Sequence, residues 1–270
     1  MQDDDKAPWL VARAAVERLT RGIPVAALGV RSSRTADIAR VARSSGHHAI
    51  WVDLEHSTMP IDTAALICAA ALDLGLAPFA RIPEREYGVI GRLLDGGVLG
   101  IIAPRVESAE EAQDIVAACR FPPFGHRSAV ATLPHLGFQK MPAAQFNRTM
   151  NEATVVKILL ESPRGIENAE AIAALPGVDI VGIGTNDLTA EMGVAGEFRH
   201  PDVRKAHESA IAACRRAQKP LAIGGIGDLA YAAELIRLGA APFMFTGIDT
   251  DLLLTAARDR VSQALASLKP

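Results

Sequence analysis

Eight short apolar runs, each separated from the next by a longer segment, constrain the fold of this 270-residue chain most strongly. In the intervening segments apolar residues recur three and four positions apart, as over 61–74 and 229–238. Continuous apolar strands that alternate with amphipathic helices are typical of a parallel sheet covered by helices. The runs begin at Ile23, Ala49, Ala77, Leu99, Val155, Val178, Pro220 and Ala241.

Eight such units in about 250 residues predict an α/β protein with a (β/α)8 TIM barrel. Residues 8–270 are expected to form this single domain, and residues 1–7 a disordered tail. A further helix, predicted over 8–21, precedes the first strand, and we expect it to cap the bottom of the barrel. A doubly wound open sheet is the alternative, but no Gly-x-Gly-x-x-Gly motif follows the first run.

Composition narrows the class of protein further. Aromatic residues make up 4% of the chain, so Ala, Val, Ile and Leu are expected to form most of the core. The net charge of −3 and the absence of a long basic block argue against nucleic-acid binding. No apolar run reaches the ~18 residues of a membrane span, and the N-terminus lacks the pattern of a signal peptide. Cys68, Cys119 and Cys214 lie far apart and are interpreted as small buried hydrophobes of a cytoplasmic protein.

The segment 121–151 is the longest connection in the predicted barrel. It contains Pro122, Pro123, Gly125, Pro134, Gly137 and Pro142. Long ordered loops in a compact domain are usually functional or lie at a subunit interface.

Charged residues follow several of the apolar runs directly. In a (β/α)8 barrel the carboxyl ends of all strands meet at one mouth, where active sites lie. Residues far apart in the sequence would therefore gather there, and their convergence predicts an active site. The residues are Asp53, Glu55, His56, Arg81, Glu161 and Asp187.

Glu161 and Asp187 end neighbouring strands and are the candidate metal ligands. Two carboxylates without a nearby cysteine favour a hard divalent cation, here Mg²⁺, Mn²⁺ or Co²⁺. With only two protein ligands, most coordination positions are left to water and substrate, which is typical of a catalytic metal. The alternatives are an ion pair with a surface arginine or, for Asp187, a helix cap.

His56 is the candidate general base, because an imidazole can exchange protons near neutral pH. Asp53, three residues earlier, could hold its ring. Arg81 offers a fixed positive charge for a carboxylate or a developing enolate oxygen. The alternatives are a half-buried histidine bonded to the backbone, and an ion pair of Arg81 with Glu84 or Glu86.

Glycines mark the turn after the sixth run. Gly182, Gly184 and Thr185 would leave backbone N–H groups free where the strand passes into its helix, and such turns bind anions. The substrate carboxylate is the expected ligand, although glycine there can equally serve tight packing.

Together these residues resemble the HpcH/HpaI family of metal-dependent (class II) pyruvate aldolases. The resemblance extends in order and spacing from the first to the eighth run. The matching segments are VDLEH (52–56), ARIP (80–83), RFPPFGHRS (120–128), LES (160–162) and IGTNDLTAEMG (183–193).

The resemblance implies that Glu161 and Asp187 hold the ion, and that pyruvate or a close 2-oxo acid chelates it. His56, supported by Asp53, would move protons, and Arg81 would stabilise the metal-bound enolate. The reaction would be reversible cleavage of a 4-hydroxy-2-oxo acid into the 2-oxo acid and an aldehyde. Family members are typically hexamers that exchange their last helix, so a homo-oligomer (hexamer or trimer) is expected.

The resemblance also implies contacts to the substrate. Gly184, Thr185 and Asn186 stand where the family has Gly-Pro-Ala, and Arg127 matches an arginine of the long loop that contacts substrate or a neighbouring subunit; a structural ion pair is its alternative. Two further departures surround the substrate. Leu159 replaces a glutamine, and Pro134 with His135 replaces an Ala-Arg pair.

Three other functions remain open. A Schiff-base aldolase would use Lys157, but a strand rises ~3.3 Å per residue, which places Lys157 about 13 Å below the mouth. A lyase acting on a CoA thioester, from the citrate- and malyl-CoA-lyase branch, would suit Arg81, Glu161 and Asp187. A non-catalytic barrel could sense a 2-oxo acid.

Overall fold

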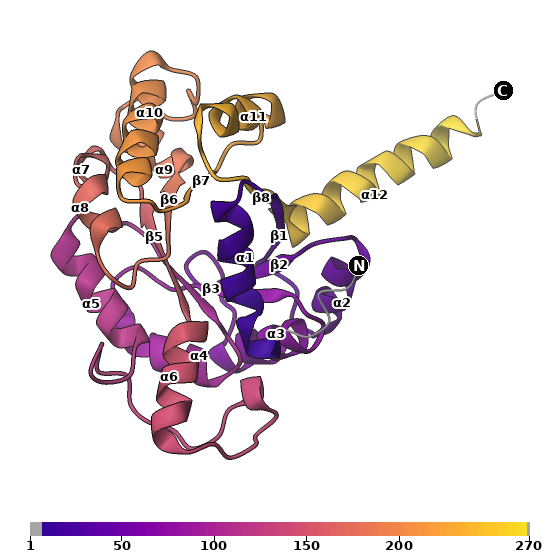
Figure 1. Cartoon of the computed structure of the whole chain (residues 1–270). Coiled ribbons are helices and arrows are strands. Elements are labelled where there is room, and N and C mark those ends of the chain that lie inside the picture. Colours follow the sequence, from indigo (N-terminus) through magenta and orange to yellow (C-terminus); the bar gives the residue numbers. More distant parts are fainter. Residues whose placement is uncertain (1–6, 269–270) are drawn as a thin grey trace.

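Eight parallel strands form the centre of the computed structural model, which describes residues 7–268. Each strand coincides with one of the eight predicted apolar runs, the last strand ending one residue beyond its run, and the helical segments alternate with them as expected (Figure 1). The strands are β1 (Val25–Val30), β2 (Ala49–Asp53), β3 (Ala77–Arg81), β4 (Gly100–Ala103), β5 (Val155–Leu160), β6 (Ile180–Gly184), β7 (Leu221–Gly224) and β8 (Phe243–Ile248).

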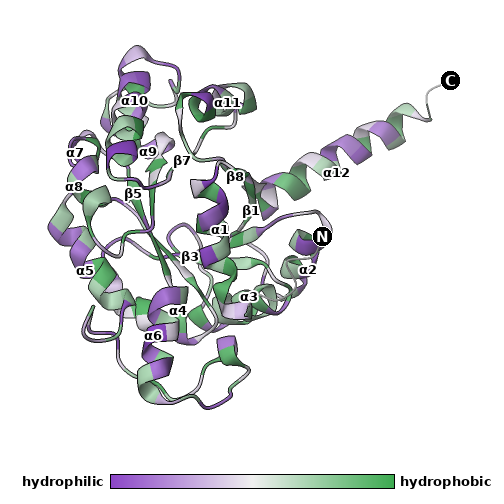
Figure 2. Ribbon diagram, in the orientation of Figure 1, coloured by the Kyte–Doolittle hydropathy of each residue, from purple (hydrophilic) through white to green (hydrophobic). Residues whose placement is uncertain are grey.

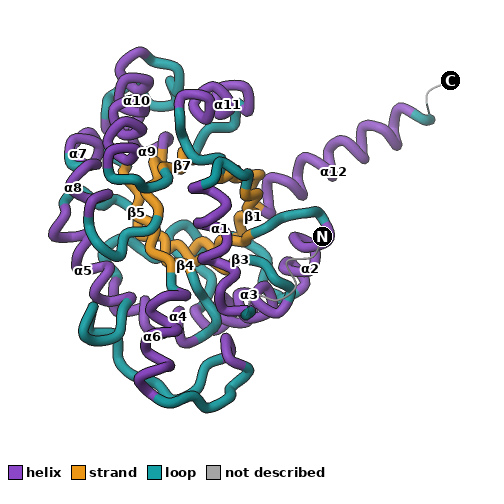
Figure 3. Tube along the Cα trace, viewed as in Figure 1, coloured by secondary structure: helices purple, strands orange, loops and turns teal. Residues whose placement is uncertain are grey.

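The strands follow one another around a nearly closed ring (Figure 3). The order is β7-β6-β5-β4-β3-β2-β1-β8, and β1 pairs with both β2 and β8. Between β7 and β8 the described residues form no ladder, and the backbone N–H of Ala241 donates to the carbonyl of Leu221 at 2.7 Å near the base of these strands. The predicted (β/α)8 barrel is confirmed, with a seam between β7 and β8.

Helices surround the ring because their apolar faces cover the outward side chains of the strands, chiefly Val, Ile, Leu and Ala. Three short 3-10 turns accompany them: η1 (Pro8–Leu10), η2 (Tyr87–Val89) and η3 (Pro134–Leu136). The helices are α1 (Val11–Thr20), α2 (Asp37–Ser44), α3 (Ile61–Asp73), α4 (Ile90–Asp95), α5 (Ala109–Cys119), α6 (Ala143–Ala153), α7 (Pro163–Glu167), α8 (Ala169–Ala174), α9 (Thr185–Glu191), α10 (Pro201–Arg216), α11 (Leu229–Leu238) and α12 (Asp249–Ala266).

The extra N-terminal helix is present as η1 and α1, and it covers the bottom of the barrel as expected. Its buried residues Ala12, Ala15, Val16 and Leu19 pack with the first residues of several strands. Residues 1–6 of the predicted tail lie outside the described residues, whereas Ala7 is described and precedes η1.

The long connection 121–151 also lies at the bottom, because it returns the chain from a helix to the start of β5. Phe121, Leu133, Leu136 and Phe146 from this connection pack in the same apolar cluster as α1. This end of the barrel is opposite the mouth where βα loops carry the chemistry.

The core consists mostly of Ala, Val, Ile and Leu, as expected, but large side chains fill part of the inside of the barrel. Trp51 packs edge-on against Phe245, and Phe243 packs against Phe245. Glycines on other strands make the room: a Cβ on Gly29 would lie 2.9 Å from the Trp51 ring, and one on Gly224 would lie 3.0 Å from the Phe245 ring.

The last helix, α12, projects away from the barrel (Figure 1). None of its residues is buried, and Leu253 is 71% exposed. Hydrophobic residues recur along it among hydrophilic ones (Figure 2). No helix in the described part of the chain is long and apolar enough to cross a membrane. Cys68, Cys119 and Cys214 are buried free thiols, as expected.

Candidate active site

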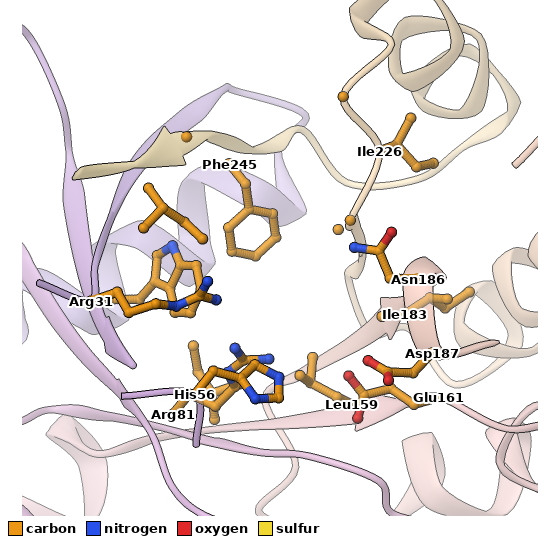
Figure 4. A pocket seen from close by; sticks show the side chains of 18 of the residues that line it. Arg31, His56, Arg81, Leu159, Glu161, Ile183, Asn186, Asp187, Ile226 and Phe245 are labelled. Carbon is orange, nitrogen blue, oxygen red and sulfur yellow. The ribbon is translucent and has the colours of Figure 1, made fainter. Parts of the chain in front are cut away.

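A cavity of about 630 Å³ opens at the carboxyl ends of the strands (Figure 4). It lies where the fold predicts the chemistry, and it is lined by residues from most of the strands. Among the lining residues are six predicted for the site: His56, Arg81, Glu161, Gly184, Asn186 and Asp187.

Asp53 is fully buried at the end of β2 and organises the cations around it. Its carboxylate accepts hydrogen bonds from Arg81 at 2.8 and 3.1 Å and from Arg31 at 3.0 Å. It also accepts the backbone N–H groups of Glu55 and His56 at 3.1 Å each. Burial alone would raise the pKa of Asp53, but these hydrogen bonds, led by Arg81, bring it below its ordinary value.

Arg81 is held rigidly beside the cavity. Besides Asp53, its guanidinium pairs with Glu55 at 3.0 Å, and its centre lies 5.1 Å from the ring centroid of Trp51. The alternative of an ion pair with Glu84 or Glu86 is wrong, because the described ion pairs of Arg81 are those with Asp53 and Glu55. A cation fixed in this way keeps its position when a substrate oxygen approaches.

His56 lies at the mouth with about half of its side chain exposed. Its Nε2 is 3.6 Å from a carboxylate oxygen of Glu55. The expectation that Asp53 holds the ring is wrong, because the Asp53 carboxylate is turned toward the two arginines and bonds only the backbone of His56. Glu55 is therefore the carboxylate next to the imidazole.

Glu161 is 3% exposed and points into the cavity just beyond the end of β5. One oxygen accepts the backbone N–H of Arg105 at 2.8 Å. Burial raises the pKa of Glu161 to about 7, and nearby carboxylates add to the rise. A Cβ on Gly184 would collide with this carboxylate, so the glycine gives Glu161 its place.

Asp187 is the third residue of α9, and it therefore does not cap the helix. Its carboxylate lies next to that of Glu161 (Figure 4), and Arg105 approaches it at 3.8 Å. The pair fits a divalent cation, because Glu161 is a buried carboxylate whose hydrogen bond comes from a neutral N–H. Among the described residues there is no group of three or more His, Cys, Asp and Glu that could hold a metal.

The two other residues of the turn before Asp187 face different ways. The Asn186 side chain lines the cavity. Thr185 is fully buried, with its hydroxyl 3.3 Å from His207 Nε2, so its side chain points to α10 and leaves only its backbone for a ligand.

Arg127 lies at the opposite end of the barrel. It pairs with Asp95 at 2.7 Å and stacks on Phe121 at 4.6 Å, and it is buried there. The expected contact with substrate in the same subunit is wrong, because a connection from helix to strand lies at the bottom of a barrel. The structural ion pair was the correct alternative, and a contact with a neighbouring subunit stays a prediction. His135 is buried at this end too, 3.0 Å from the carbonyl of Val98.

Two charged residues around the cavity, Arg31 and Arg105, escaped the sequence analysis, and a third, Lys157, was placed too deep. Arg31 follows β1 and Arg105 lies shortly after β4, so extending the same rule for strand ends to these strands would have found both. Lys157 lines the cavity although its place on β5 is deep. The depth argument against it is wrong, because it placed the backbone and ignored the length of the side chain.

The fold and the pocket define an enzyme of the (β/α)8-barrel class with its chemistry at the mouth of the barrel. The profile of the HpcH/HpaI aldolase/citrate lyase family matches residues 31–256, and the chain belongs to this family. Within it the chain is a carbon–carbon lyase of the pyruvate aldolase type.

Two curated relatives illustrate the similarity. The chain is 35% identical over 246 residues to a 4-hydroxy-4-methyl-2-oxoglutarate aldolase of Hapsidospora irregularis, covering 90% of this chain and 91% of the relative. It is 30% identical to a 2-keto-3-deoxy-L-rhamnonate aldolase of Salmonella gallinarum, covering 86% and 85%. These two proteins act on different acids.

Solved structures agree with the fold. The crystal structure of an HpcH/HpaI aldolase from Desulfitobacterium hafniense superposes with a TM-score of 0.86 at 25% identity, covering 94% of this chain and 96% of the other. An HpcH/HpaI aldolase/citrate lyase family protein from Burkholderia cenocepacia superposes with a TM-score of 0.83 at 29% identity, covering 93% and 98%.

Proposed function

We propose that this protein is a divalent-metal-dependent aldolase that reversibly cleaves a 4-hydroxy-2-oxo acid into pyruvate, or a close 2-oxo acid, and an aldehyde. One observation carries the proposal: the adjacent carboxylates of Glu161 and Asp187 share a pocket with a fixed arginine and an accessible histidine. An aldol cleavage needs charge stabilisation and proton transfer, and the arginine and the histidine can provide them.

Glu161 and Asp187 would hold Mg²⁺, Mn²⁺ or Co²⁺. The raised pKa of Glu161 marks a buried carboxylate whose charge the nearby Arg81 offsets only in part, and a cation there would offset the rest. When bound, the ion would act as a Lewis acid on the keto group of the substrate.

The chain's own residues would handle charge and protons. His56, with Glu55 beside its ring, takes the proton of the 4-hydroxyl group as the C3–C4 bond breaks. The electron pair of that bond remains on the donor half as an enolate, and the aldehyde leaves. Arg81, fixed by Asp53 and Glu55, stabilises the negative charge that develops on the donor oxygen.

The donor acid would be oriented at the start of α9. Gly184, the backbone N–H of Thr185 and the side chain of Asn186 lie beside the two carboxylates and offer donors to the substrate carboxylate. We also predict that the enzyme is cytoplasmic and that it assembles as a homo-oligomer, either a hexamer or a trimer.

The test follows the methyl protons of pyruvate by NMR in deuterated buffer. We expect Mn²⁺, Mg²⁺ or Co²⁺ to support exchange of these protons for deuterium, chelation to stop it, and the metal to restore it. Glu161→Ala and Asp187→Ala should abolish exchange and leave the circular dichroism spectrum unchanged. Wild-type exchange by either variant at ordinary metal concentrations would refute the site.

The alternative is a lyase acting on a CoA thioester, since the family name includes citrate lyase. The curated relatives at 30–35% identity are named as aldolases, which favours free acids. A protein that cleaves malyl-CoA and turns over no free 2-oxo acid would reverse this choice. Borohydride trapping of pyruvate on Lys157 would instead indicate the Schiff-base aldolase.

A further inference from the structure

Lys157 is a buried cation inside the active-site cavity. It lies on β5 with 1% of its surface exposed, and it lines the same cavity as Glu161. Its Nζ lies 4.5 Å from the ring centroid of Phe243 and 4.4 Å from that of Phe245. The ammonium group therefore lies against two aromatic rings of β8, a strand separated from β5 by β6 and β7 around the ring.

The barrel is shaped to let this side chain rise toward the mouth. The backbone of Lys157 pairs with Ile180 of β6, but its Cε lies beside Gly182, two residues nearer the carboxyl end. A Cβ on Gly182 would lie 2.9 Å from this Cε. The lysine thus reaches the floor of the cavity through space that a glycine leaves open.

No described carboxylate around the cavity forms a direct ion pair with Lys157. Arg31 and Arg81 are paired with Asp53 and Glu55. None of the ion pairs between described residues includes Lys157. Burial, with a smaller contribution from Arg81, lowers the pKa of Lys157 to about 7, and the Glu161 carboxylate offsets only part of this shift. A bound anion would complete the site.

The cavity has two chemically different ends. Glu161 and Asp187 lie at one side, and Phe245, which packs against the Lys157 ammonium, lies across from them (Figure 4). A volume of about 630 Å³ is in the range of cavities that take drug-sized ligands, so there is room beyond a three-carbon acid.

We propose that Lys157 is a specificity-determining residue that binds a second carboxylate on the substrate, carried by the part that leaves as the aldehyde. This inference rests on the proposed function, in which the first carboxylate binds beside Glu161 and Asp187. The preferred substrates are then dicarboxylic 4-hydroxy-2-oxo acids. Trp51, Ile102 and Leu159 line the cavity as well, and they would contact the carbon chain between the two charged ends.

The experiment compares two aldehydes that differ in one end. Succinic semialdehyde and pentanal, in which an ethyl group replaces the carboxylate, are each condensed with pyruvate in the presence of Mn²⁺. We expect Lys157→Met to lower the ratio of kcat/KM for the two aldehydes by about tenfold or more, because a charged hydrogen bond is lost. Lys157→Gln, which keeps a polar end but loses the charge, should also lower this ratio. Lys205→Met, at an exposed lysine of α10, is the control and should leave the ratio unchanged.

Calorimetric binding of 2-oxoglutarate and of pyruvate, each with Mn²⁺, gives a readout that needs no turnover. We expect Lys157→Met to weaken 2-oxoglutarate binding at least about tenfold more than pyruvate binding. An unchanged ratio, an equal loss for both ligands, or a borohydride adduct on Lys157 would overturn the inference. Failure of the proposed function is recognised separately, as absence of pyruvate proton exchange in the wild type.

Discussion

At the scale of single residues, Gly184 shows how closely backbone and catalytic side chain fit. The sequence suggested a turn that binds an anion through free N–H groups. The structure adds a steric role, since any side chain on Gly184 would enter the volume of the Glu161 carboxylate. Its φ of −91° is open to every residue, so the requirement is space and not backbone conformation.

Gly184→Ala should therefore impair the carboxylate pair and leave the fold intact. We expect roughly a 10-fold to 100-fold loss of Mn²⁺ affinity, the scale seen when ligands are misplaced by their surroundings. Titration of Mn²⁺ followed by electron paramagnetic resonance measures it. Gly88→Ala is the control, because a Cβ there meets nothing within 4 Å. Equal affinities of the two variants would contradict the steric role.

Lys157 makes stability depend on pH. Its pKa is about 7 in the folded protein and about 10.4 in an unfolded chain. Between these values the unfolded chain binds a proton that the folded protein does not, so this residue adds stability as pH rises and removes it as pH falls. The slope should reach about 1.4 kcal/mol per pH unit.

Urea denaturation at pH 7, 8 and 9 tests this slope. Lys157→Met should be more stable than the wild type at pH 7, and the difference should shrink as pH rises. Parallel profiles for the two proteins would show that the amine is not desolvated in the folded state.

The strand-end rule predicted the location of the site but not the partners within it. His56, Arg81, Glu161 and Asp187 line the cavity because the carboxyl ends of the barrel strands meet at its mouth. The pairing of Glu55 with His56, and the turn of Thr185 toward His207, depend on side-chain directions that spacing does not contain.

At the scale of elements, the side of the barrel on which a connection lies decides its role. The alternation of strands and helices predicted every strand and the helix before β1. Arg127 was misjudged because the length of its loop was considered and its direction, from helix to strand, was not. The seam between β7 and β8 could not be predicted either, because an apolar run does not show which two neighbouring strands fail to form a hydrogen-bonded ladder.

The loop after β1 is tied to the start of α12. Asp249 accepts the backbone N–H groups of Arg31, Ser32 and Ser33 at 2.6–3.3 Å. Arg31 in turn pairs with Asp53 in the active site. The position of this loop therefore depends on a carboxylate at the first residue of α12.

Asp249→Ala should loosen that loop. We expect faster hydrogen exchange at the amides of Ser32 and Ser33, and a lower rate of pyruvate proton exchange as Arg31 loses its anchor. Asp259→Ala, an exposed change further along α12, is the control. Unaltered amide protection in Asp249→Ala would show that other contacts hold the loop.

At the scale of the whole molecule, α12 is a helix whose apolar side chains are not covered by the rest of the described chain. Its exposed apolar residues include Leu252, Leu253, Leu254, Val261 and Leu265. Exposed apolar surface of this kind marks an interaction site, and a second copy of the chain is the partner that the predicted homo-oligomer supplies.

Sedimentation velocity tests this assembly. We expect a hexamer or trimer for the wild type, and a shift toward the 28.5 kDa monomer for the pair Leu253→Asp and Val261→Asp. Leu66→Asp, at a leucine of α3 that is 68% exposed, should leave the sedimentation coefficient unchanged. A wild type that sediments as a monomer at all concentrations would contradict the prediction.

Asp249 joins the base of α12 to the loop that carries Arg31, and Arg31 lines the active-site cavity. Contacts that fix α12 in an assembly would therefore also fix the loop that carries Arg31. Dilution that dissociates the subunits would then loosen α12 and the loop that carries Arg31 together. The specific activity of the enzyme should then rise with protein concentration until every subunit has its neighbours, so an assay at nanomolar enzyme would measure a less competent catalyst than the concentrated protein.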